Sequence, residues 1–260
     1  MQTAYEGVAG QRVVVTAGAS GIGRAIADML VAHDARVHIC DIADDFLHDF
    51  AAAHPEAGVT QADVSRDADV DRLFDEAAGS LGGLDALINN AGIAGPTGAI
   101  EDLDPGEWRH CIDVCLTGQF LCARRATPLL KRAGGGSIVG MASVAGKYGY
   151  AFRTPYASAK FGIIGLTQSL AKELGPSNIR VNAILPGIVE GARMQSVIRN
   201  RATQLGVSYE EMESQYLQKI SLRRMVTMDD VAAMTLFLMS NAGRNLSGQS
   251  IAVDGNVETL

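Results

Sequence analysis

The chain has 260 residues, is 47% hydrophobic and 20% charged, and carries a net charge of −7. This length and balance predict one globular α/β domain, and the acidic charge argues against a nucleic-acid or anionic-membrane partner. No apolar run approaches the length of a membrane span. The opening "MQTAYEGVAGQR" lacks the basic and apolar regions of a signal peptide. We therefore expect a cytoplasmic protein.

Short β-branched runs alternate with amphipathic stretches along the chain. The expected strands cover residues 12–18, 35–41, 58–64, 84–92, 136–143, 179–185 and 250–255. The expected helices cover residues 21–32, 69–82, 105–133, 155–174, 191–206 and 227–240, with one more opening at "SYEE" (208–211). Regular alternation predicts parallel βαβ units. We expect a single Rossmann-type, doubly wound parallel sheet of about seven strands over residues 1–260, with helices on both faces.

A glycine-rich segment, "TAGASGIG" (16–23), stands between the first expected strand and the first helix. Glycine lets a backbone turn sharply and approach a phosphate, and a helix N-terminus offers free N–H groups to that phosphate. The segment is therefore a candidate dinucleotide-binding loop, although a plain glycine-rich turn has the same composition. Its candidate cofactor residues are Gly18, Ser20, Gly21, Ile22 and Gly23.

Asp41 ends the second expected strand. A carboxylate there can accept hydrogen bonds from the adenosine ribose and would repel a 2′-phosphate. No Arg or Lys follows it in "DIADDFLHDF" (41–50), and Ser20 rather than a basic residue precedes Gly21. These residues favour NAD over NADP, with the alternative that Asp41 is one more acid of an acidic loop.

The four cysteines form no CxxC pair and the five histidines are scattered. Cys40 ends a strand, and Cys111, Cys115 and Cys122 share one expected helix. We interpret them as reduced packing residues and expect no metal site.

Five motifs stand in order at the expected strand ends. They are "TAGASGIG", "NNAG" (89–92), Ser143 in "MASVAG", Tyr156 with Lys160 in "TPYASAK" (154–160), and "PG" (186–187). In this combination the chain resembles a classical short-chain dehydrogenase/reductase over nearly its whole length. The resemblance implies further cofactor contacts at Asp63, Val64, Asn90, Ala91, Gly92, Pro186, Gly187 and Val189, and a homotetramer.

The resemblance also assigns catalytic roles. Tyr156 would exchange a proton with a secondary alcohol or ketone while hydride passes to or from the nicotinamide. Lys160 would favour the phenolate and hold the nicotinamide ribose, and Ser143 would orient the substrate oxygen. We expect Thr154 to cap this helix and Pro155 to be its first residue.

Three positions depart from the family pattern. Cys115 stands where the family has an asparagine in a proton relay, and a thiol is a poor hydrogen-bond partner. Gly191 stands where a threonine often binds the nicotinamide amide. Ala17 replaces the first glycine of the loop, a change that we expect to be minor.

Residues 188–225 are expected to form a lid over the substrate. The expected substrate is a secondary alcohol or ketone, possibilities for which include a hydroxy or keto acid and a polyol. Candidate substrate contacts are Ala94, Tyr150, Phe152, Arg153 and Met194. Arginines at 153, 193, 223 and 224 raise the possibility of an anionic substrate such as a keto or hydroxy acid, although for any single one a solvated lid charge is the favoured interpretation. Two other functions stay open: a catalytically weak NAD-binding sensor or scaffold, motivated by Cys115 and Gly191, and an NADPH-dependent 3-oxoacyl-type reductase, against which Asp41 argues.

Overall fold

A computed structural model of the protein describes residues 5–258, without the side chains of residues 193, 200 and 204. Seven strands form one parallel sheet in the order β3-β2-β1-β4-β5-β6-β7. They are β1 (Arg12–Thr16), β2 (Arg36–Asp41), β3 (Gly58–Gln61), β4 (Ala86–Asn89), β5 (Gly136–Met141), β6 (Ile179–Pro186) and β7 (Ser250–Val253). The order reverses between β1 and β4, the place where doubly wound sheets bind ligands. The predicted fold class is confirmed.

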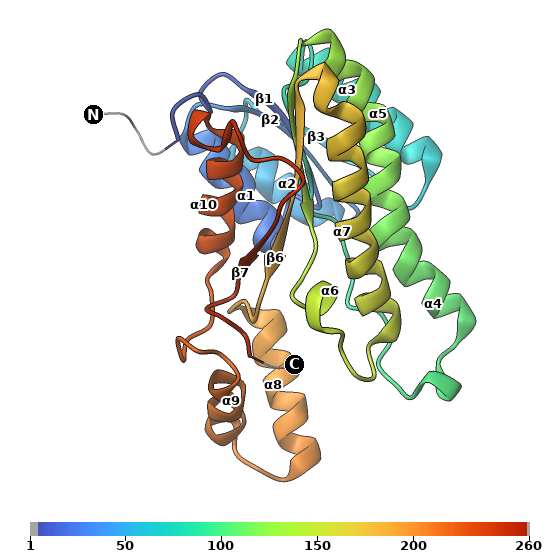
Figure 1. Cartoon of the computed structure of the whole chain (residues 1–260), viewed down its shortest axis with the longest axis vertical. Coiled ribbons are helices and arrows are strands. Elements are labelled where there is room, and N and C mark those ends of the chain that lie inside the picture. The colour runs from blue at the N-terminus through green and yellow to red at the C-terminus, as the bar shows by residue number, and fades with distance from the viewer. Residues whose placement is uncertain (1–4, 259–260) are drawn as a thin grey trace.

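Helices cover both faces of the sheet (Figure 1). The helices are α1 (Gly21–Ala32), α2 (Asp44–Ala53), α3 (Asp67–Leu81), α4 (Pro105–Ile112), α5 (Gly118–Arg132), α6 (Ala145–Tyr148), α7 (Thr154–Leu174), α8 (Ala192–Leu205), α9 (Tyr209–Gln218) and α10 (Met228–Met239). α1 and α10 lie on one face, and α3, α5 and α7 lie on the other. Within the described chain, no helix combines the length and apolarity that spanning a bilayer requires.

Strand β1 shows why the sheet must be covered twice. Successive side chains of a strand point to opposite faces. Val13 and Val15 pack into the core shared with α1, α2 and α10, whereas Val14 packs into the core shared with α3 and α5. All three valines are fully buried, and each contributes roughly 1.5–3 kcal/mol of transfer free energy.

The strands end earlier than the apolar runs suggest. β1 stops at Thr16 rather than at residue 18, and β5 stops at Met141 rather than at residue 143. The candidate residues that follow are therefore in loops beyond the carboxyl ends of the strands. Loops at this edge are free to present side chains to a ligand, whereas strand residues are committed to the ladder.

The expected helix 105–133 forms, but it is not uniform. Asp104 caps it by accepting hydrogen bonds from the backbone N–H groups of Gly106 (2.8 Å) and Glu107 (2.9 Å), and Pro105 begins it. Residues Asp113–Thr117 then form a π-helical turn between α4 and α5. Such turns insert one residue and re-aim the side chains around them, often at functional sites.

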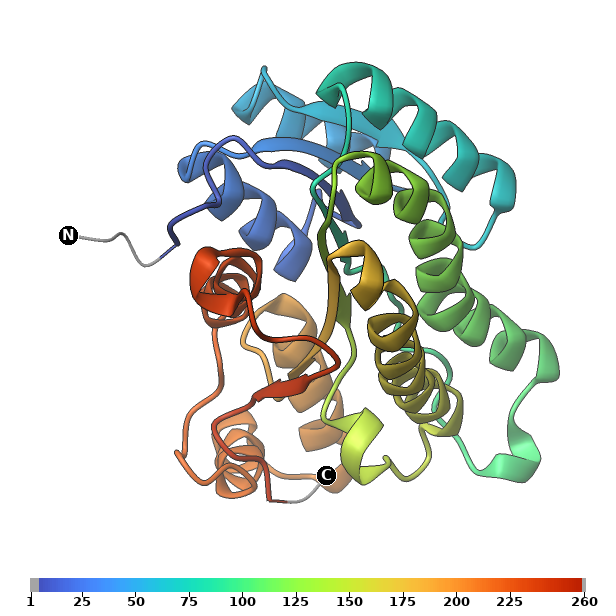
Figure 2. The same cartoon turned by 45° about the horizontal axis from the view of Figure 1, so that its top comes forward.

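The expected lid consists of α8 and α9, which extend beyond the carboxyl ends of the strands (Figures 1 and 2). Ser208 caps α9 by accepting a hydrogen bond from Glu211 N at 3.0 Å, as "SYEE" predicts. Ile198, Ala202 and Met212 form a small buried cluster between the two helices. The pair therefore has a core of its own beside the sheet.

Candidate active site

A pocket of about 470 Å³ lies at the carboxyl ends of the central strands. The three predicted catalytic residues, Ser143, Tyr156 and Lys160, all line it. Ser143 comes from the loop after β5, and the other two come from the first turns of α7. Residues at i and i+4 share a helix face, which is why Tyr156 and Lys160 face the same pocket.

Ser143 is held in place by its own loop. It is buried, and its Oγ accepts a hydrogen bond from Ala145 N at 3.1 Å. A hydroxyl has one donor as well as its acceptor lone pairs. With a backbone N–H on the oxygen, the hydroxyl proton is directed to another acceptor in the pocket.

Two cations flank the ring of Tyr156. Lys160 Nζ lies 5.5 Å from the ring centroid and Arg153 Cζ lies 5.0 Å from it. Lys160 is buried, and its ammonium donates to the backbone oxygen of Met141 at 2.8 Å. Both cations therefore lie within cation–π distance of the Tyr156 ring.

The start of α7 differs from the sequence prediction by one residue. The helix begins at Thr154, and Arg153 is its N-cap residue, without a side-chain capping bond. In the described structure, Thr154 Oγ1 is buried and has no hydrogen-bond partner. The prediction that Thr154 caps the helix is therefore wrong, because Arg153 takes the non-helical cap position.

The loop after β1 fits a dinucleotide phosphate. Ser20, Gly21 and Ile22 line the pocket. Gly21 has a φ of +55°, and a Cβ added to it would meet nothing within 4 Å, so its backbone is open to a close approach. The N-terminus of α1 has no side-chain cap and no acidic residue in its first turn, which leaves N–H groups for an anion.

Gly18 and Gly23 have packing roles instead. A Cβ on Gly18 would lie 2.7 Å from Ile39, and one on Gly23 would lie 2.0 Å from Ala17 O. These glycines let the loop sit tightly between β2 and α1. Neither lines the pocket among the described residues, and their predicted contact with a cofactor stays a prediction.

The "NNAG" segment braces that same loop. Asn90 Nδ2 donates to the backbone oxygens of Thr16 and Ala17, both at 3.1 Å. Thr16 Oγ1 accepts from the backbone N–H groups of Asn90 and Ala91, both at 3.0 Å. Asn90 and Gly92 line the pocket, whereas Ala91 is buried behind them. The β1 and β4 loops are thus one rigid unit.

Asp41 lies directly beneath the β1 loop. Its carboxylate accepts from Ala19 N at 3.3 Å and from Ala43 N at 3.2 Å, and the residue is 8% exposed. A negative charge is therefore fixed beside the glycine-rich segment. This position fits the predicted contact with the adenosine ribose, although Asp41 does not line the described pocket.

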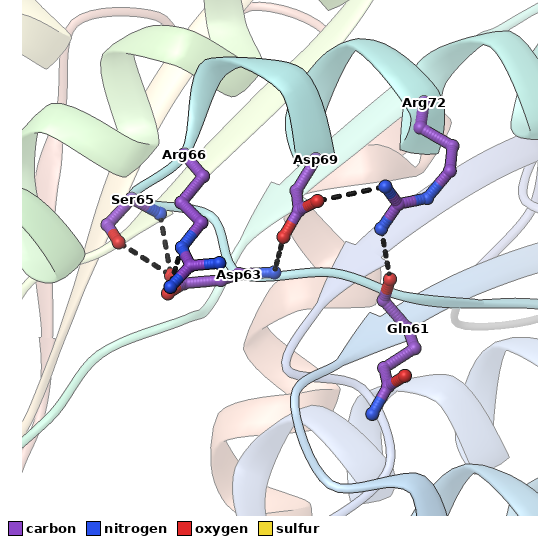
Figure 3. Close-up of polar contacts among 6 residues, drawn as sticks. All are labelled: Gln61, Asp63, Ser65, Arg66, Asp69 and Arg72. Carbon is purple, nitrogen blue, oxygen red and sulfur yellow. Dashed lines mark hydrogen bonds and ion pairs between the residues drawn. The ribbon is translucent and has the colours of Figure 1, made fainter.

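The turn after β3 is stabilised by a small polar network (Figure 3). The Asp63 carboxylate accepts from Ser65 N at 2.9 Å and from Ser65 Oγ at 2.7 Å. Asp69 accepts from Asp63 N at 3.1 Å and from Arg72 at 2.9 Å, and these partners lower the pKa of Asp69. Val64 is buried against Gly118. The expected adenine contacts at Asp63 and Val64 stay predictions, because both residues lie outside the described pocket.

The loop after β6 forms another part of the pocket wall. Pro186, Gly187 and Val189 line the pocket as predicted. Gly191 also lines it, with a φ of +140°, and an added Cβ would lie 2.7 Å from Met228 Cε. This backbone favours glycine, so the family threonine could stand here only if the loop and Met228 moved.

Of the predicted substrate contacts, Tyr150, Arg153 and Met194 line the pocket. Ala94 contributes its backbone oxygen to Arg153 at 2.7 Å without lining the cavity, and Phe152 is 62% exposed. Sequence reasoning missed Tyr216 and Lys219, which reach the pocket from the end of α9. Their spacing of three residues places them on one helix face, the signal that could have found them.

Comparison with known proteins agrees with this arrangement. A family model described as Enoyl-(Acyl carrier protein) reductase matches residues 16–257. The chain is 36% identical over 255 residues to cis-4-hydroxycyclohexanecarboxylate dehydrogenase of Sinomonas cyclohexanicum, covering 96% of this chain and 97% of that protein. The solved structure of levodione reductase matches with a TM-score of 0.88 and 30% identity over 95% of this chain and 97% of that one. NAD⁺-bound xylitol dehydrogenase matches with a TM-score of 0.90 and 25% identity over 96% and 100%.

The chain belongs to the short-chain dehydrogenase/reductase family. It is an oxidoreductase that acts on the CH–OH group of a secondary alcohol, or on the corresponding carbonyl. Members of this family use a nicotinamide cofactor. The open Gly21 loop and the uncapped N-terminus of α1 fit such a group.

Proposed function

We propose that the protein is an NAD-dependent dehydrogenase in which Ser143, Tyr156 and Lys160 carry the reaction. The observation that carries the proposal is the convergence of these three side chains on one pocket with the open Gly21 loop. The bound nicotinamide would supply the hydride acceptor or donor. The protein's residues would bind, orient and exchange the proton.

Each residue has a role that its contacts support. Tyr156 Oη takes the proton of the alcohol, because Tyr156 lines the same pocket as Ser143 and Lys160. Ser143 donates its hydroxyl proton to the substrate oxygen, since Ala145 N already occupies its acceptor side. Lys160, steadied by Met141 O, holds the nicotinamide ribose and keeps positive charge beside Tyr156.

NAD rather than NADP is the cofactor that Asp41 supports. Its buried carboxylate lies against the β1 loop, where a 2′-phosphate would meet it, and repulsion there disfavours NADP. The similarity to an NAD⁺-bound xylitol dehydrogenase agrees with this assignment. The name of the Sinomonas cyclohexanicum relative adds that a hydroxy acid is a reasonable first substrate to test.

The assembly that we propose is a homotetramer in the cytoplasm. Phe120 on α5 and Phe161 on α7 are each 48% exposed, so the two long helices present aromatic side chains to solvent. Apolar side chains of this size at the surface are typical of interfaces between subunits. We further propose that residues 188–225 act as the lid of a single domain.

The test of the function is nicotinamide reduction by the purified protein with paired secondary alcohols and hydroxy acids. Tyr156→Phe is expected to lower kcat by roughly 10²–10⁴-fold, because it removes the proton acceptor. Tyr148→Phe is the matched control, since Tyr148 is exposed and lies outside the described pocket. NADH binding without turnover of any alcohol would contradict the proposal and favour a sensor.

A further inference from the structure

The pocket concentrates positive charge in an acidic protein. Among the described residues that line it, Arg153, Lys160 and Lys219 are cations and Glu190 is a carboxylate, whereas the whole chain has a net charge of −7. Lys160 is already bonded to Met141 O and belongs to the proposed reaction. Arg153 and Lys219 are two further cations whose presence that reaction does not explain.

Arg153 is held in place without full pairing of its N–H groups. Its guanidinium lies 5.3 Å from the ring centroid of Tyr150 and 5.0 Å from that of Tyr156, and its Nη2 donates to Ala94 O at 2.7 Å. Within the described part of the chain, its buried Nε has no hydrogen-bond partner. A charged donor group that is incompletely paired is costly, and this guanidinium lines the pocket, so an acceptor supplied by a ligand there would stabilise it.

The chemistry of a guanidinium limits which class of ligand it would bind. Its planar fork of donors matches a carboxylate or phosphate better than it matches a neutral hydroxyl. The two rings and the bond to Ala94 O hold the guanidinium in place, so little freedom is lost when an anion binds. Arg153 also lies beside the phenol that would take the alcohol proton, so the anion and the reacting carbon belong to one small molecule.

Two side chains of the expected lid, Lys219 and Tyr216, line the same pocket as Arg153. Lys219, at the end of α9, places its Nζ 5.4 Å from the ring centroid of Tyr216. Tyr216 is partly buried, and burial raises its pKa, which keeps its hydroxyl protonated and able to donate. Arg223, by contrast, donates to the backbone oxygens of Gln218 and Ile220 and lies outside this pocket, and Arg224 lies in another cavity.

Much of the remaining wall is apolar, although Ser20, Asn90 and Glu190 also line the pocket. Its described lining includes Ile93, Ile188, Met194, Val197 and Met228. A polyol or sugar phosphate would need hydrogen-bond partners along its whole length, and this wall provides few. A hydrocarbon body with one hydroxyl and one carboxylate matches the lining better.

Building on the dehydrogenase function proposed above, we propose that Arg153, assisted by Lys219, binds the carboxylate of the substrate. The substrate is then a secondary hydroxy acid, or the matching keto acid, with a hydrocarbon body. Its carboxylate accepts from the Arg153 guanidinium while its hydroxyl faces Ser143 and Tyr156. Arg153 determines specificity, and the acid end of the substrate fixes which carbon reaches Tyr156.

The test is direct binding of a carboxylate that lacks the reacting hydroxyl. Isothermal titration calorimetry of the NADH-saturated protein would compare cyclohexanecarboxylate with cyclohexanecarboxamide, a neutral molecule of the same shape. We expect the acid to bind the wild type at least roughly tenfold more tightly than the amide. Arg153→Met should abolish this preference, and Arg153→Lys should restore part of it.

Matched variants separate the site from net charge. Arg132→Met removes the same charge from an exposed position on α5 and should leave the preference unchanged. Lys219→Met should reduce the preference by a smaller factor than Arg153→Met. Equal binding of acid and amide to the wild type, no measurable binding of the acid at millimolar concentration, or an Arg153→Met variant that keeps the preference would each overturn the proposal.

The outcomes also separate this inference from the proposed function. Tyr156-dependent oxidation of neutral alcohols without any preference for the acid would leave the dehydrogenase standing and remove the carboxylate site. A clear preference for the acid in calorimetry without turnover of any alcohol would keep the site and remove the dehydrogenase. In turnover, Arg153→Met should raise KM for a hydroxy acid and leave KM for its methyl ester nearly unchanged.

Discussion

The thiol of Cys115 contacts both backbone polar groups of Ile93. Its Sγ accepts from Ile93 N at 3.3 Å and lies 3.5 Å from Ile93 O as a donor. A Cβ added to Gly92 would lie 3.6 Å from this sulfur and 3.4 Å from Lys160 Nζ, so the thiol and the ammonium flank one glycine. The π-helical turn of Asp113–Thr117 presents Cys115 to the β4 loop. Cys115 therefore stabilises the loop at the position where the family has its relay asparagine.

Replacing this thiol tests whether it positions the loop or relays a proton. Cys115→Ala should lower the free energy of unfolding by about 1–2 kcal/mol, because it leaves a small cavity and an unpaired N–H group. It should keep kcat within about threefold and leave the pH profile of kcat unshifted. Urea unfolding and steady-state kinetics measure the two effects. Cys122→Ala, on the same helix and equally buried, is the stability control. A tenfold fall in kcat with a shifted pH profile would instead assign Cys115 to the relay.

Cofactor choice should depend on the charge of Asp41. Asp41→Asn keeps an oxygen that can accept from Ala19 N or Ala43 N but removes the negative charge. We expect the ratio of kcat/KM for NAD to that for NADP to fall by roughly tenfold or more, since the repulsion of a 2′-phosphate is lost. Asp44→Asn is the control, because Asp44 is exposed at the start of α2. An unchanged ratio would mean that another group selects the cofactor.

The loop alanine is a site of backbone strain. Ala17 has a φ of +48°, in the left-handed region that a side chain disfavours, and Asn90 holds its carbonyl there at 3.1 Å. Ala17→Gly should relieve about 1–2 kcal/mol of strain and lose part of that through a more flexible unfolded chain. We therefore expect a net gain of about 0.5–1 kcal/mol in the urea unfolding of the protein.

The same substitution at a helical position is expected to change the free energy of unfolding in the opposite direction. Ala52→Gly, on an exposed position of α2, should lower the free energy of unfolding by about 1 kcal/mol, the usual cost of glycine in a helix. Equal destabilisation by both variants would show that Ala17 is not strained. A gain in stability from Ala17→Gly would instead explain why the family has glycine at this position. The exchange to alanine would then matter more than the sequence suggests.

Local sequence patterns predict much of the fold and part of the candidate active site. The cap at Ser208 and the Tyr156–Lys160 pair are short-range signals, and each is found where the spacing predicts it. Strand ends mark the functional edge because parallel strands share one direction. Residues at those ends could therefore be selected without knowing any contact.

Features that depend on distant contacts could not be predicted in this way. Arg153 shares a pocket with Lys219 and Tyr216 only because α9 returns to it, and no local spacing encodes that approach. The π-helical turn contains Cys115, whose contact with Ile93 is not encoded in helix propensity. The sequence pattern does not predict helix α2. This helix follows Ala43 without a side-chain cap, and its acidic segment resembles a loop.

Strand β2 contains a buried histidine that the catalytic proposal does not use. His38 is 2% exposed, with Nε2 2.8 Å from Thr60 Oγ1 and Nδ1 2.9 Å from Ser80 Oγ. The hydroxyl of Thr60 in turn donates to the carboxylate of Glu76. These partners suit a neutral imidazole, with Nε2–H donating to Thr60. Burial lowers the pKa of His38 to about 4, and Glu76 opposes this only partly.

His38 should make the protein sensitive to mild acid. A histidine in the unfolded chain titrates near pH ~6.5, so between that pH and about 4 the unfolded state binds one proton more than the folded state. Stability must then fall as the pH drops through this window, by up to about 1.4 kcal/mol per pH unit. Urea unfolding of wild type and His38→Gln between neutral and acidic pH measures the difference, and the variant should show the shallower dependence. His48→Gln, whose side chain is exposed, should follow the wild type. Parallel curves for wild type and His38→Gln would show that the carboxylates alone control acid stability, because removing the buried imidazole would then have changed no proton uptake on unfolding.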